Sequence, residues 1–474
     1  MDSKSKISTV EEIIKEKTIS NDLEKNSPIT KPSFDIPDGG YGWVIVFALH
    51  SIFMVTWGAN SGFAVYLAHY LNEDLFENAT KIDYAWIGGL AFGLGLMIAP
   101  IITFLVGFFG FKQMMCVGAT FEFAAMMLAS FSVDLWQLYL TQGALQGLGL
   151  AFTFVPSIHL ISQWFKKKRT LAMGLVSGGA GTGGILFALA MNEIMVSKNV
   201  QWALRSQAII CLVLTMISIV LLKDRSDKIH PEFKPIDSLI LKNKGFWINF
   251  CWIFFVLLAF VIVQYSISDF TKSLGYSAHQ GSVVAAIVSL GALVLRPIFG
   301  IASDRFGPAT VTCLVYFTSS ILCFAMWISC RNYATDLAFG FFIGGLMGFI
   351  WPALGSIIPR TVGLRKTGVC YGMHWIAIGI LGIVSPVIGL VLRGPVNESN
   401  NYVNPTAYVN PAIFCGSMFF GASFFLFLLR AFLIARDSLS EKDADSDHSQ
   451  ELLIVVPWSL VLKSMFILNP SKKA

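Results

Sequence analysis

Arg296 is the residue whose type and position point most directly to chemistry. It lies inside an apolar run, residues 279–303, about seven residues from the end of that run. At about 1.5 Å per residue of helix the guanidinium is roughly 10 Å deep, where an arginine costs up to about 2.5–3.5 kcal/mol on insertion scales. A guanidinium there suits a carboxylate, because its fork makes two parallel charge-assisted hydrogen bonds. The alternatives are snorkelling to the membrane interface and a structural bond to a carbonyl oxygen.

Neutral polar side chains occur inside other apolar runs. Asn60 and Ser61 lie past the middle of residues 43–68, in the sequence Gly58-Ala59-Asn60-Ser61-Gly62. The two glycines either leave backbone carbonyls free to face a cavity or allow close packing of helices. Further residues of this kind are Gln142, Gln146, Tyr265, Trp351 and Tyr371. They either line a cavity for a polar organic solute or hydrogen-bond between helices. Trp351 either stacks on a ring of the solute or marks a kink beside Pro352.

Glu122 lies in the middle of residues 111–131, with no Lys or Arg within one helical turn. An ionised carboxylate is costly at that depth. We interpret Glu122 as a protonated or hydrogen-bonded structural residue rather than as a site of proton coupling.

The composition predicts an all-α membrane protein that holds these residues in the bilayer. The 474 residues are 55% hydrophobic and 13% charged, and the mean hydropathy is +0.66, whereas a soluble domain is about a quarter charged. A helix needs about 20 apolar residues to cross a bilayer. Twelve runs satisfy this: 43–68, 84–106, 111–131, 135–161, 170–192, 204–222, 246–270, 279–303, 308–330, 335–359, 368–392 and 411–436.

The longest polar gap, residues 223–243, divides these runs into six plus six. We therefore expect a disordered cytosolic tail at 1–42, one six-helix bundle at 43–222, a cytosolic linker at 223–245, a second bundle at 246–436 and a cytosolic tail at 437–474. The apolar stretch 452–462 is short and contains Pro457, which favours an interfacial segment over a thirteenth span.

Several classes of function receive no support. The basic residues form no long face with interleaved aromatic residues, which argues against nucleic-acid binding. The eight cysteines fall in or at the ends of apolar runs without a C-x-x-C pair, so we expect neither a metal site nor another cofactor. The chain has no H-E-x-x-H or G-x-S-x-G sequence, and an enzyme is therefore not expected.

The loop charges predict that both termini are cytosolic. Fifteen Lys and Arg residues lie in the loops on the side of the linker, against about five on the other side, and basic loops stay in the cytosol. The sequons at Asn78 and Asn397 both fall in loops predicted to face outward. The cytosolic cluster Lys166 to Arg169, with Asp38, either anchors a helix end at anionic lipid or makes a charge contact in one state only.

The two halves of the chain repeat. Ala99-Pro100 through Gly110 aligns with Arg296-Pro297 through Gly307, at an offset of 197 (306 − 109 = 197). Two six-helix halves related in this way are typical of transporters that bind a solute between the halves.

Three motifs resemble known sequences. Gly300-Ile301-Ala302-Ser303-Asp304-Arg305-Phe306-Gly307 resembles the G-x-x-x-D-R-x-G loop of the major facilitator superfamily. Asp38-Gly39-Gly40-Tyr41-Gly42-Trp43 resembles the signature of the monocarboxylate transporter family. Trp164-Phe165-Lys166-Lys167-Lys168-Arg169-Thr170-Leu171-Ala172-Met173-Gly174 resembles that family's second motif. The residues carried over are Asp38, Gly39, Gly40, Trp43, Lys167, Arg169, Gly300, Asp304 and Arg305. The amino-acid sequence around these motifs is similar to that of the fungal branch of the monocarboxylate transporter family.

The resemblance fails at two positions. Proton-coupled members of the family carry a helix 1 lysine where this chain has Ser61, and a helix 8 aspartate where it has Ala292; their helix 8 arginine is matched by Arg296. The resemblance therefore implies a major facilitator fold and alternating-access transport of a small organic solute, without the family's coupling pair. The solute is expected to be a monocarboxylate or a larger ring compound such as a riboflavin-like one. We expect the plasma membrane, with the vacuolar membrane as the alternative, and a non-transporting nutrient sensor is the rival function.

Overall fold

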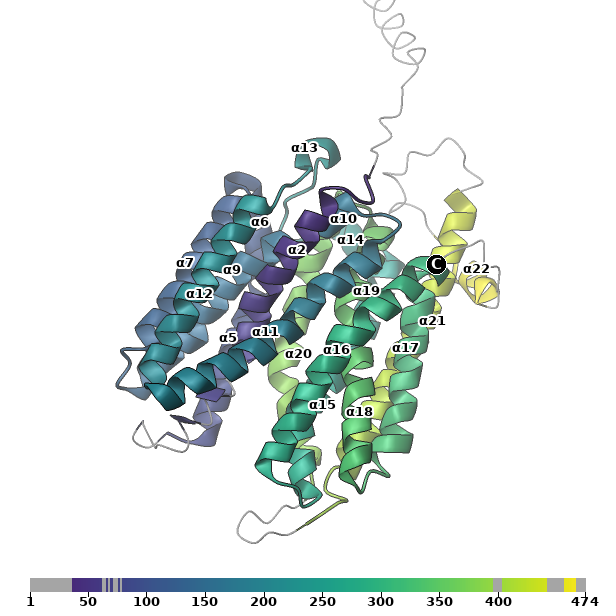
Figure 1. Cartoon of the computed structure of the whole chain (residues 1–474). Helices are drawn as coiled ribbons and strands as arrows, with labels where there is room; N and C mark the ends of the chain where they lie inside the picture. Colours follow the sequence, from purple (N-terminus) through teal and green to yellow (C-terminus); the bar gives the residue numbers. More distant parts are fainter. Residues whose placement is uncertain are drawn as a thin grey trace, which may run out of the picture. The chain divides into compact units, whose positions relative to one another are not determined.

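Long apolar runs become helices in a bilayer, because lipid offers no hydrogen-bond partner to the backbone. In the computed structural model, residues 36–474 group as one unit, and every regular element of the described residues is a helix (Figure 1). The structure describes residues 36–61, 65–66, 69–70, 76, 79–394, 403–440 and 456–465.

The first half of the chain contributes six helical segments, three of them broken or bent. They are α2 (Gly42–Phe53) with η1 (Met54–Gly58) and α3 (Ala59–Ser61); α5 (Lys81–Met97) with α6 (Ala99–Phe109); α7 (Phe111–Ala129); α8 (Leu135–Leu138) with η2 (Tyr139–Leu145), α9 (Gln146–Ile158) and α10 (Leu160–Trp164); α11 (Arg169–Ser197); and α12 (Val200–Leu221).

The second half contributes six more segments. They are α15 (Lys244–Ser273), α16 (Ala278–Phe306), α17 (Pro308–Leu322) with η3 (Cys323–Trp327), α18 (Tyr333–Met347) with α19 (Ile350–Val362), α20 (Thr367–Leu392) and α21 (Val409–Ser440). The linker between the halves carries two short helices, α13 (Ser226–Ile229) and α14 (Ser238–Lys242), and α22 (Trp458–Ser464) follows the last long helix.

Eleven of the twelve segments are long and apolar enough to cross a membrane, counting α5 and α6 as one span bent by 50°. The bend occurs where Pro100 lies in the first turn of α6, because proline cannot donate the helical hydrogen bond. The twelfth segment is α7, which is less apolar because it contains Lys112, Gln113 and Glu122. The twelve expected spans therefore all correspond to helices of the described residues.

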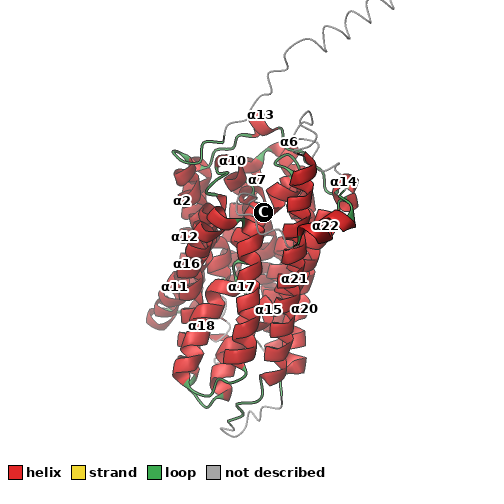
Figure 2. Cartoon of the chain, turned by 90° about the vertical axis from the view of Figure 1, so that its right-hand side faces the viewer, coloured by secondary structure: helices red, strands yellow, loops and turns green. Residues whose placement is uncertain are grey.

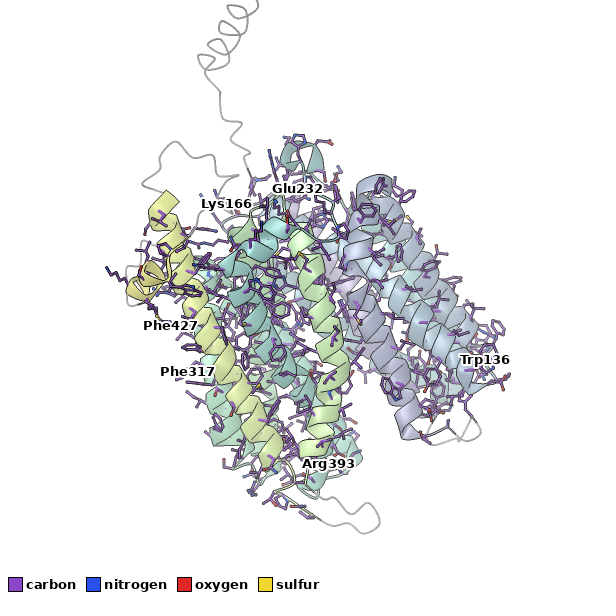
Figure 3. All side chains as sticks on the ribbon, turned by 180° about the vertical axis from the view of Figure 1, so that it is seen from behind. Trp136, Lys166, Glu232, Phe317, Arg393 and Phe427 are labelled. Carbon is purple, nitrogen blue, oxygen red and sulfur yellow. The ribbon has the colours of Figure 1, made fainter. Side chains whose placement is uncertain are left out.

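The linker, α10, α13 and α14 lie at one end of the bundle, here named the linker end (Figures 1 and 2). Trp136 and Arg393 lie at the other end, here named the open end, where the two halves diverge (Figure 3). The helix α22 has only seven residues and packs beside α21 at the linker end, with Val461 buried and Trp458 half exposed. It is too short to form a span.

The two halves meet along two equivalent seams near the linker end. On one seam, a Cβ atom at Gly174 of α11 would lie 2.9 Å from the carbonyl oxygen of Arg296 and 3.3 Å from Cα of Pro297, on α16. On the other, a Cβ atom at Gly372 of α20 would lie 3.2 Å from Cα of Pro100 on α6. The prolines are one repeat apart (297 − 100 = 197). The sequence repeat therefore reappears as a repeated contact between the halves.

Candidate functional site

Arg296 lies at the first seam as a buried cation without an acidic partner among the described residues. Its side chain is on α16, and the residue is only 7% exposed. One guanidinium nitrogen, Nη1, donates to the backbone oxygen of Ser177 on α11 at 3.1 Å, while Nε has no hydrogen-bond partner. A buried guanidinium with an unused donor is ready to bind an anion.

A break between helices α18 and α19 makes room for this guanidinium. The helix is interrupted at Gly348 and Phe349, and the guanidinium of Arg296 lies directly against the backbone of Gly348. A Cβ atom at position 348 would overlap Nη2 of Arg296, so a larger residue there would displace the guanidinium from this position.

Aromatic rings close the space between the halves at this level. Phe154 of α9 packs edge-to-face against Trp375 of α20, with ring centroids 5.5 Å apart. Trp57 of η1 packs edge-to-face on Phe154 at 5.3 Å, and Trp351 of α19 stacks on Trp375 at 5.8 Å. Phe154 and Trp375 are fully buried, whereas Trp57 and Trp351 are half-buried. The half-buried indoles at the two edges offer faces for stacking a ring.

The two predicted helix 1 residues are at least partly accessible. Ser61 is exposed and its hydroxyl donates to the carbonyl oxygen of Trp57 at 2.9 Å, while Asn60 is half-buried. A Cβ atom at Gly184 of α11 would lie 3.7 Å from Cβ of Ser61. Ser61 therefore lies beside α11, the helix that also supplies the Ser177 carbonyl.

The other predicted cavity residues do not form one group. Gln142 and Gln146 are each 3% exposed, and Gln142 donates to the Tyr70 hydroxyl at 3.1 Å within the first half, so Gln142 joins helices. Tyr371 is buried and stacks on Trp375 with centroids 5.7 Å apart. Tyr265 is 65% exposed and makes no side-chain hydrogen bond to a described residue.

Glu122 is buried between helices α7 and α9. It is 4% exposed, a Cβ atom at Gly149 would lie 2.6 Å from its Cγ, and its Oε1 has no hydrogen-bond partner. Its position away from the seams fits the structural interpretation.

Asp304 holds the two halves together at the linker end. Its carboxylate, at the end of α16, accepts hydrogen bonds from the backbone N–H groups of Thr170 and Leu171, both at 2.9 Å. These are free N–H groups in the first turn of α11, where the helix dipole favours an anion. Gly300 allows this approach, since a Cβ atom there would lie 2.9 Å from Cα of Leu171.

Asp38 binds the loop that precedes α11, also in the first half. It does so through backbone amides and not through the charged side chains of Lys166 to Arg169 considered in the sequence analysis. Its carboxylate accepts from the backbone N–H groups of Lys166 at 2.7 Å and Lys167 at 2.6 Å. The bonds go to amides, because the loop bends around the carboxylate and leaves the ammonium groups in solvent. Asp38 has φ +53°, and Gly40 has φ +57°. These left-handed conformations explain the glycine at position 40.

The remaining motif residues have local roles. Arg169 donates to the carbonyl oxygens of Phe165 at 2.8 Å and Ser162 at 3.2 Å, which ties α11 to the preceding helix. Trp43 packs edge-to-face on Phe165 at 5.1 Å. The Arg305 guanidinium lies over the ring of Phe306 at 5.4 Å.

In the described part of the chain no group of three His, Cys, Asp or Glu residues is arranged to hold a metal ion. Sequence reasoning missed the Ser177 carbonyl, the aromatic contacts of Phe154 and Trp375, and the contacts of the linker described below. The Trp-Pro pair at 351–352 was the only signal for the aromatic cluster. The acceptor residues of the two sequons, Asn78 and Asn397, lie outside the described residues.

The profile of the Major Facilitator Superfamily matches residues 45–386 and 263–469. The chain belongs to this superfamily. The predicted fold class, an all-α membrane protein with the major facilitator fold, is thereby confirmed. Among solved superfamily structures, the human organic anion transporter MFSD10 aligns with a TM-score of 0.63 at 10% identity, covering 82% of this chain and 100% of that one. The proton:xylose symporter XylE gives 0.63 at 13% identity, over 81% of this chain and 95% of that one.

Two relatives in Saccharomyces cerevisiae are more similar in sequence. The protein named "Probable transporter MCH2" is 44% identical over 94% of this chain and 93% of its own length. The "Uncharacterized transporter ESBP6" is 36% identical over 66% of this chain and 48% of its own length. Both names describe transporters, as do those of the solved superfamily structures.

Proposed function

We propose that this protein carries a small organic anion, of the monocarboxylate class, across a membrane by alternating access. The observation that carries this proposal is Arg296: a cation, 7% exposed, at the seam between the halves, with one carbonyl contact and an unused Nε donor. A buried charge without a counter-ion is unfavourable. A substrate carboxylate would supply the missing charge and accept the free donors.

The similarity to known proteins supports a transporter. The 44% identical relative is named a probable transporter, and the Asp38 and Arg169 motifs resemble those of the monocarboxylate transporter family. The half-buried Trp57 and Trp351 favour a substrate that combines a carboxylate with a ring, and a larger ring compound such as a riboflavin-like one is the alternative substrate.

The substrate site we propose lies beside the first seam. Arg296 binds the carboxylate, and Trp351 contacts the organic part. Asn60, Ser61 and Tyr265 contribute polar groups from the open end. Gln142, Gln146 and Tyr371 are buried in this state, so we assign them to this site only after the halves have moved.

The orientation that we propose makes the linker end cytosolic, in agreement with the basic loops. Both termini are then inside the cell, and the seams close the cytosolic side while the halves diverge toward the outside. In the opposite state the contacts of Asp304 with Thr170 and Leu171 break. We place the protein in the plasma membrane, with the vacuolar membrane as the alternative.

We propose transport without proton coupling. Ser61 and Ala292 occupy the positions of the family's coupling lysine and aspartate, and neither side chain titrates at physiological pH. Arginine stays protonated at physiological pH, so Arg296 attracts an anion but releases no proton. Among the described residues of the first half, the buried carboxyl is that of Glu122, and it lies between α7 and α9 rather than at a seam.

The test is uptake by the purified protein in liposomes. We expect accumulation of labelled monocarboxylates or ring carboxylates up to the external concentration, with little effect of an imposed pH gradient. Several-fold stimulation by inward-directed protons would contradict uncoupled transport. Specific binding of the solute without uptake would favour the nutrient sensor.

A further inference from the structure

The two seams between the halves differ at the position of a carboxylate. On the first seam, Asp304 of α16 binds the N–H groups at the start of α11. The repeat relates α16 to α6 and α11 to α20, and the counterpart of Asp304 is Gly107 (304 − 107 = 197). At the start of α20, the backbone N–H of Thr367 donates to the carbonyl oxygen of Leu364 at 3.4 Å rather than to a carboxylate. The second seam therefore lacks the carboxylate that fastens the first.

The linker occupies the place of that missing side chain. A Cβ atom at Gly107 would lie 2.6 Å from Cβ of Phe233, which is too close for any larger residue. Phe233 comes from the linker between α13 and α14. Glycine at 107 thus provides the space in which the linker docks on the end of α6.

The same stretch of linker also binds the start of α20. The backbone N–H of Glu232 donates to the carbonyl oxygen of Arg365 at 2.9 Å. Lys366, the residue before α20, forms ion pairs with Asp237 at 2.5 Å and with Glu232 at 3.8 Å. The side chains of Lys366 and Asp237 are 14% and 6% exposed, so their pair is partly shielded from solvent. Figure 3 shows Glu232 at this end of the bundle.

We propose that residues 232–237 form a second gate at the linker end, in which Lys366 is the positioning residue and Asp237 its main partner. The segment fastens the start of α20, in the second half, to the end of α6, in the first. It holds the second seam closed, as Asp304 holds the first. This inference rests on the proposed alternating access, because a gate matters only if the seams open.

Two features of the surroundings support a gate. Residues Ile229, Pro231, Glu232 and Phe233 cover a pocket between α6, α9 and α20, which is lined beneath them by Thr103, His159 and Tyr371. The linker is also fixed to the first half, since the backbone N–H of Arg225 donates to Oε1 of Gln163 at 2.7 Å. If α20 moves away from α6, the segment 232–237 must therefore leave either Gly107 or Lys366.

The carboxylate of Asp237 in the gate stays ionised at cytosolic pH. Burial raises the pKa of Asp237, but the hydrogen bonds from Lys366 and from the Leu239 N–H, together with the positive charges of Lys366 and Lys234, lower it more, so the net pKa is below its usual range. The carboxylate is therefore ionised, and the ion pair depends on geometry rather than on pH.

The experiment measures access to the covered pocket. Thr103→Cys places a thiol there, and its labelling by a water-soluble maleimide is followed by peptide-resolved mass spectrometry in the full-length purified protein. We expect slow labelling in the parent and an increase of at least about twofold with Lys366→Met, because the ion pair that holds the segment at the start of α20 is then lost. The charge swap Asp237→Lys with Lys366→Asp should return labelling toward the parent rate.

A matched control is Lys228→Met, which removes an exposed lysine of the linker that lies in α13, outside the segment 232–237. It should leave the labelling of position 103 unchanged. Equal labelling in the parent and in Lys366→Met would overturn the gate, as would an increase in Lys366→Met that the charge swap does not reverse. Because labelling needs no solute, a protein that transports nothing could still pass this test, so failure of the gate and failure of the proposed function are distinguishable.

Discussion

The carboxylate of Asp304 binds the backbone N–H of Thr170 at 2.9 Å, across the boundary between the two halves. The bond joins the end of α16 to the first turn of α11, where N–H groups have no partner within the helix. Nearby, the hydroxyl groups of Thr170 and Ser356 lie 2.5 Å apart and add a second bridge between the halves. One helix start is thus fastened to both α16 and α19.

Asp304→Asn should weaken the contact between the two halves at the linker end, although asparagine has nearly the same shape as aspartate. The amide keeps an acceptor oxygen but loses the charge, which is worth about 0.3–1 kcal/mol at a helix N-terminus and up to about 2 kcal/mol when partly buried. Uptake in liposomes should fall, and the melting temperature of the purified protein should drop by a few degrees. An unchanged melting temperature and unchanged uptake would show that Asp304 does not hold the seam.

Trp351→Leu should change substrate preference more than total activity. An aromatic contact contributes about 0.5–1.5 kcal/mol beyond its buried area, which corresponds to roughly a two- to tenfold rise in KM for a ring carboxylate. The KM for a small aliphatic monocarboxylate should change less. The comparison requires both solutes in the same liposomes, and equal effects on the two KM values would assign Trp351 to packing alone.

The ion pair of Asp237 with Lys366 should make a contribution to stability that disappears in acid. The pKa of Asp237 is lowered in the folded protein, so the pair stabilises the fold above the ordinary Asp pKa of about 3.9 and is lost as the pH falls through the lower folded value. The melting temperature of wild type should exceed that of Asp237→Asn by a constant amount between about pH 5 and 8. The difference should shrink below about pH 4, and a difference that instead grew in acid would have the wrong sign for this pair.

The proposed topology predicts that Asn78 and Asn397 are glycosylated and that both termini are inaccessible from outside intact cells. In a eukaryotic host, Asn78→Gln and Asn397→Gln should each reduce the apparent mass by one glycan, and the double variant should be insensitive to glycosidase. A tag at either terminus should bind antibody only after permeabilisation. A tag that reacts on intact cells would invert the topology.

The long helices were predictable because lipid offers the backbone no hydrogen-bond partner. An apolar run that is long enough to cross a bilayer must therefore form a helix. Arg296 and Asp304 stood out for a similar reason, as charges where charges are costly. The roles of Asp38 and Gln142 were not predictable in this way. Asp38 binds amides rather than lysine side chains because of a turn. The Nε2 of Gln142 donates to Tyr70, which is distant in sequence, while its Oε1 has no hydrogen-bond partner.

The docking of Phe233 on Gly107 left no periodic signal, because it joins an irregular linker to a helix end far away in the chain. The trace in the sequence is Gly107, which stands at the repeat position of Asp304 and leaves the aligned segment 99–110 without an aspartate. The structure shows that Phe233 occupies the space that a larger side chain at position 107 would need. Lys366 likewise counted only as a basic loop residue until its partners Asp237 and Glu232 were visible.

The most direct test of the central claim is uptake of one labelled monocarboxylate into liposomes containing equal amounts of wild type, Arg296→Lys or Arg296→Ala. Arg296 has no acidic partner in the described residues, so its removal leaves no orphaned carboxylate and should not unfold the protein. We predict clear uptake by wild type, partial uptake by Arg296→Lys, because an ammonium lacks the planar fork, and uptake near that of empty liposomes for Arg296→Ala. Wild-type uptake by Arg296→Ala at matched protein content would contradict the account.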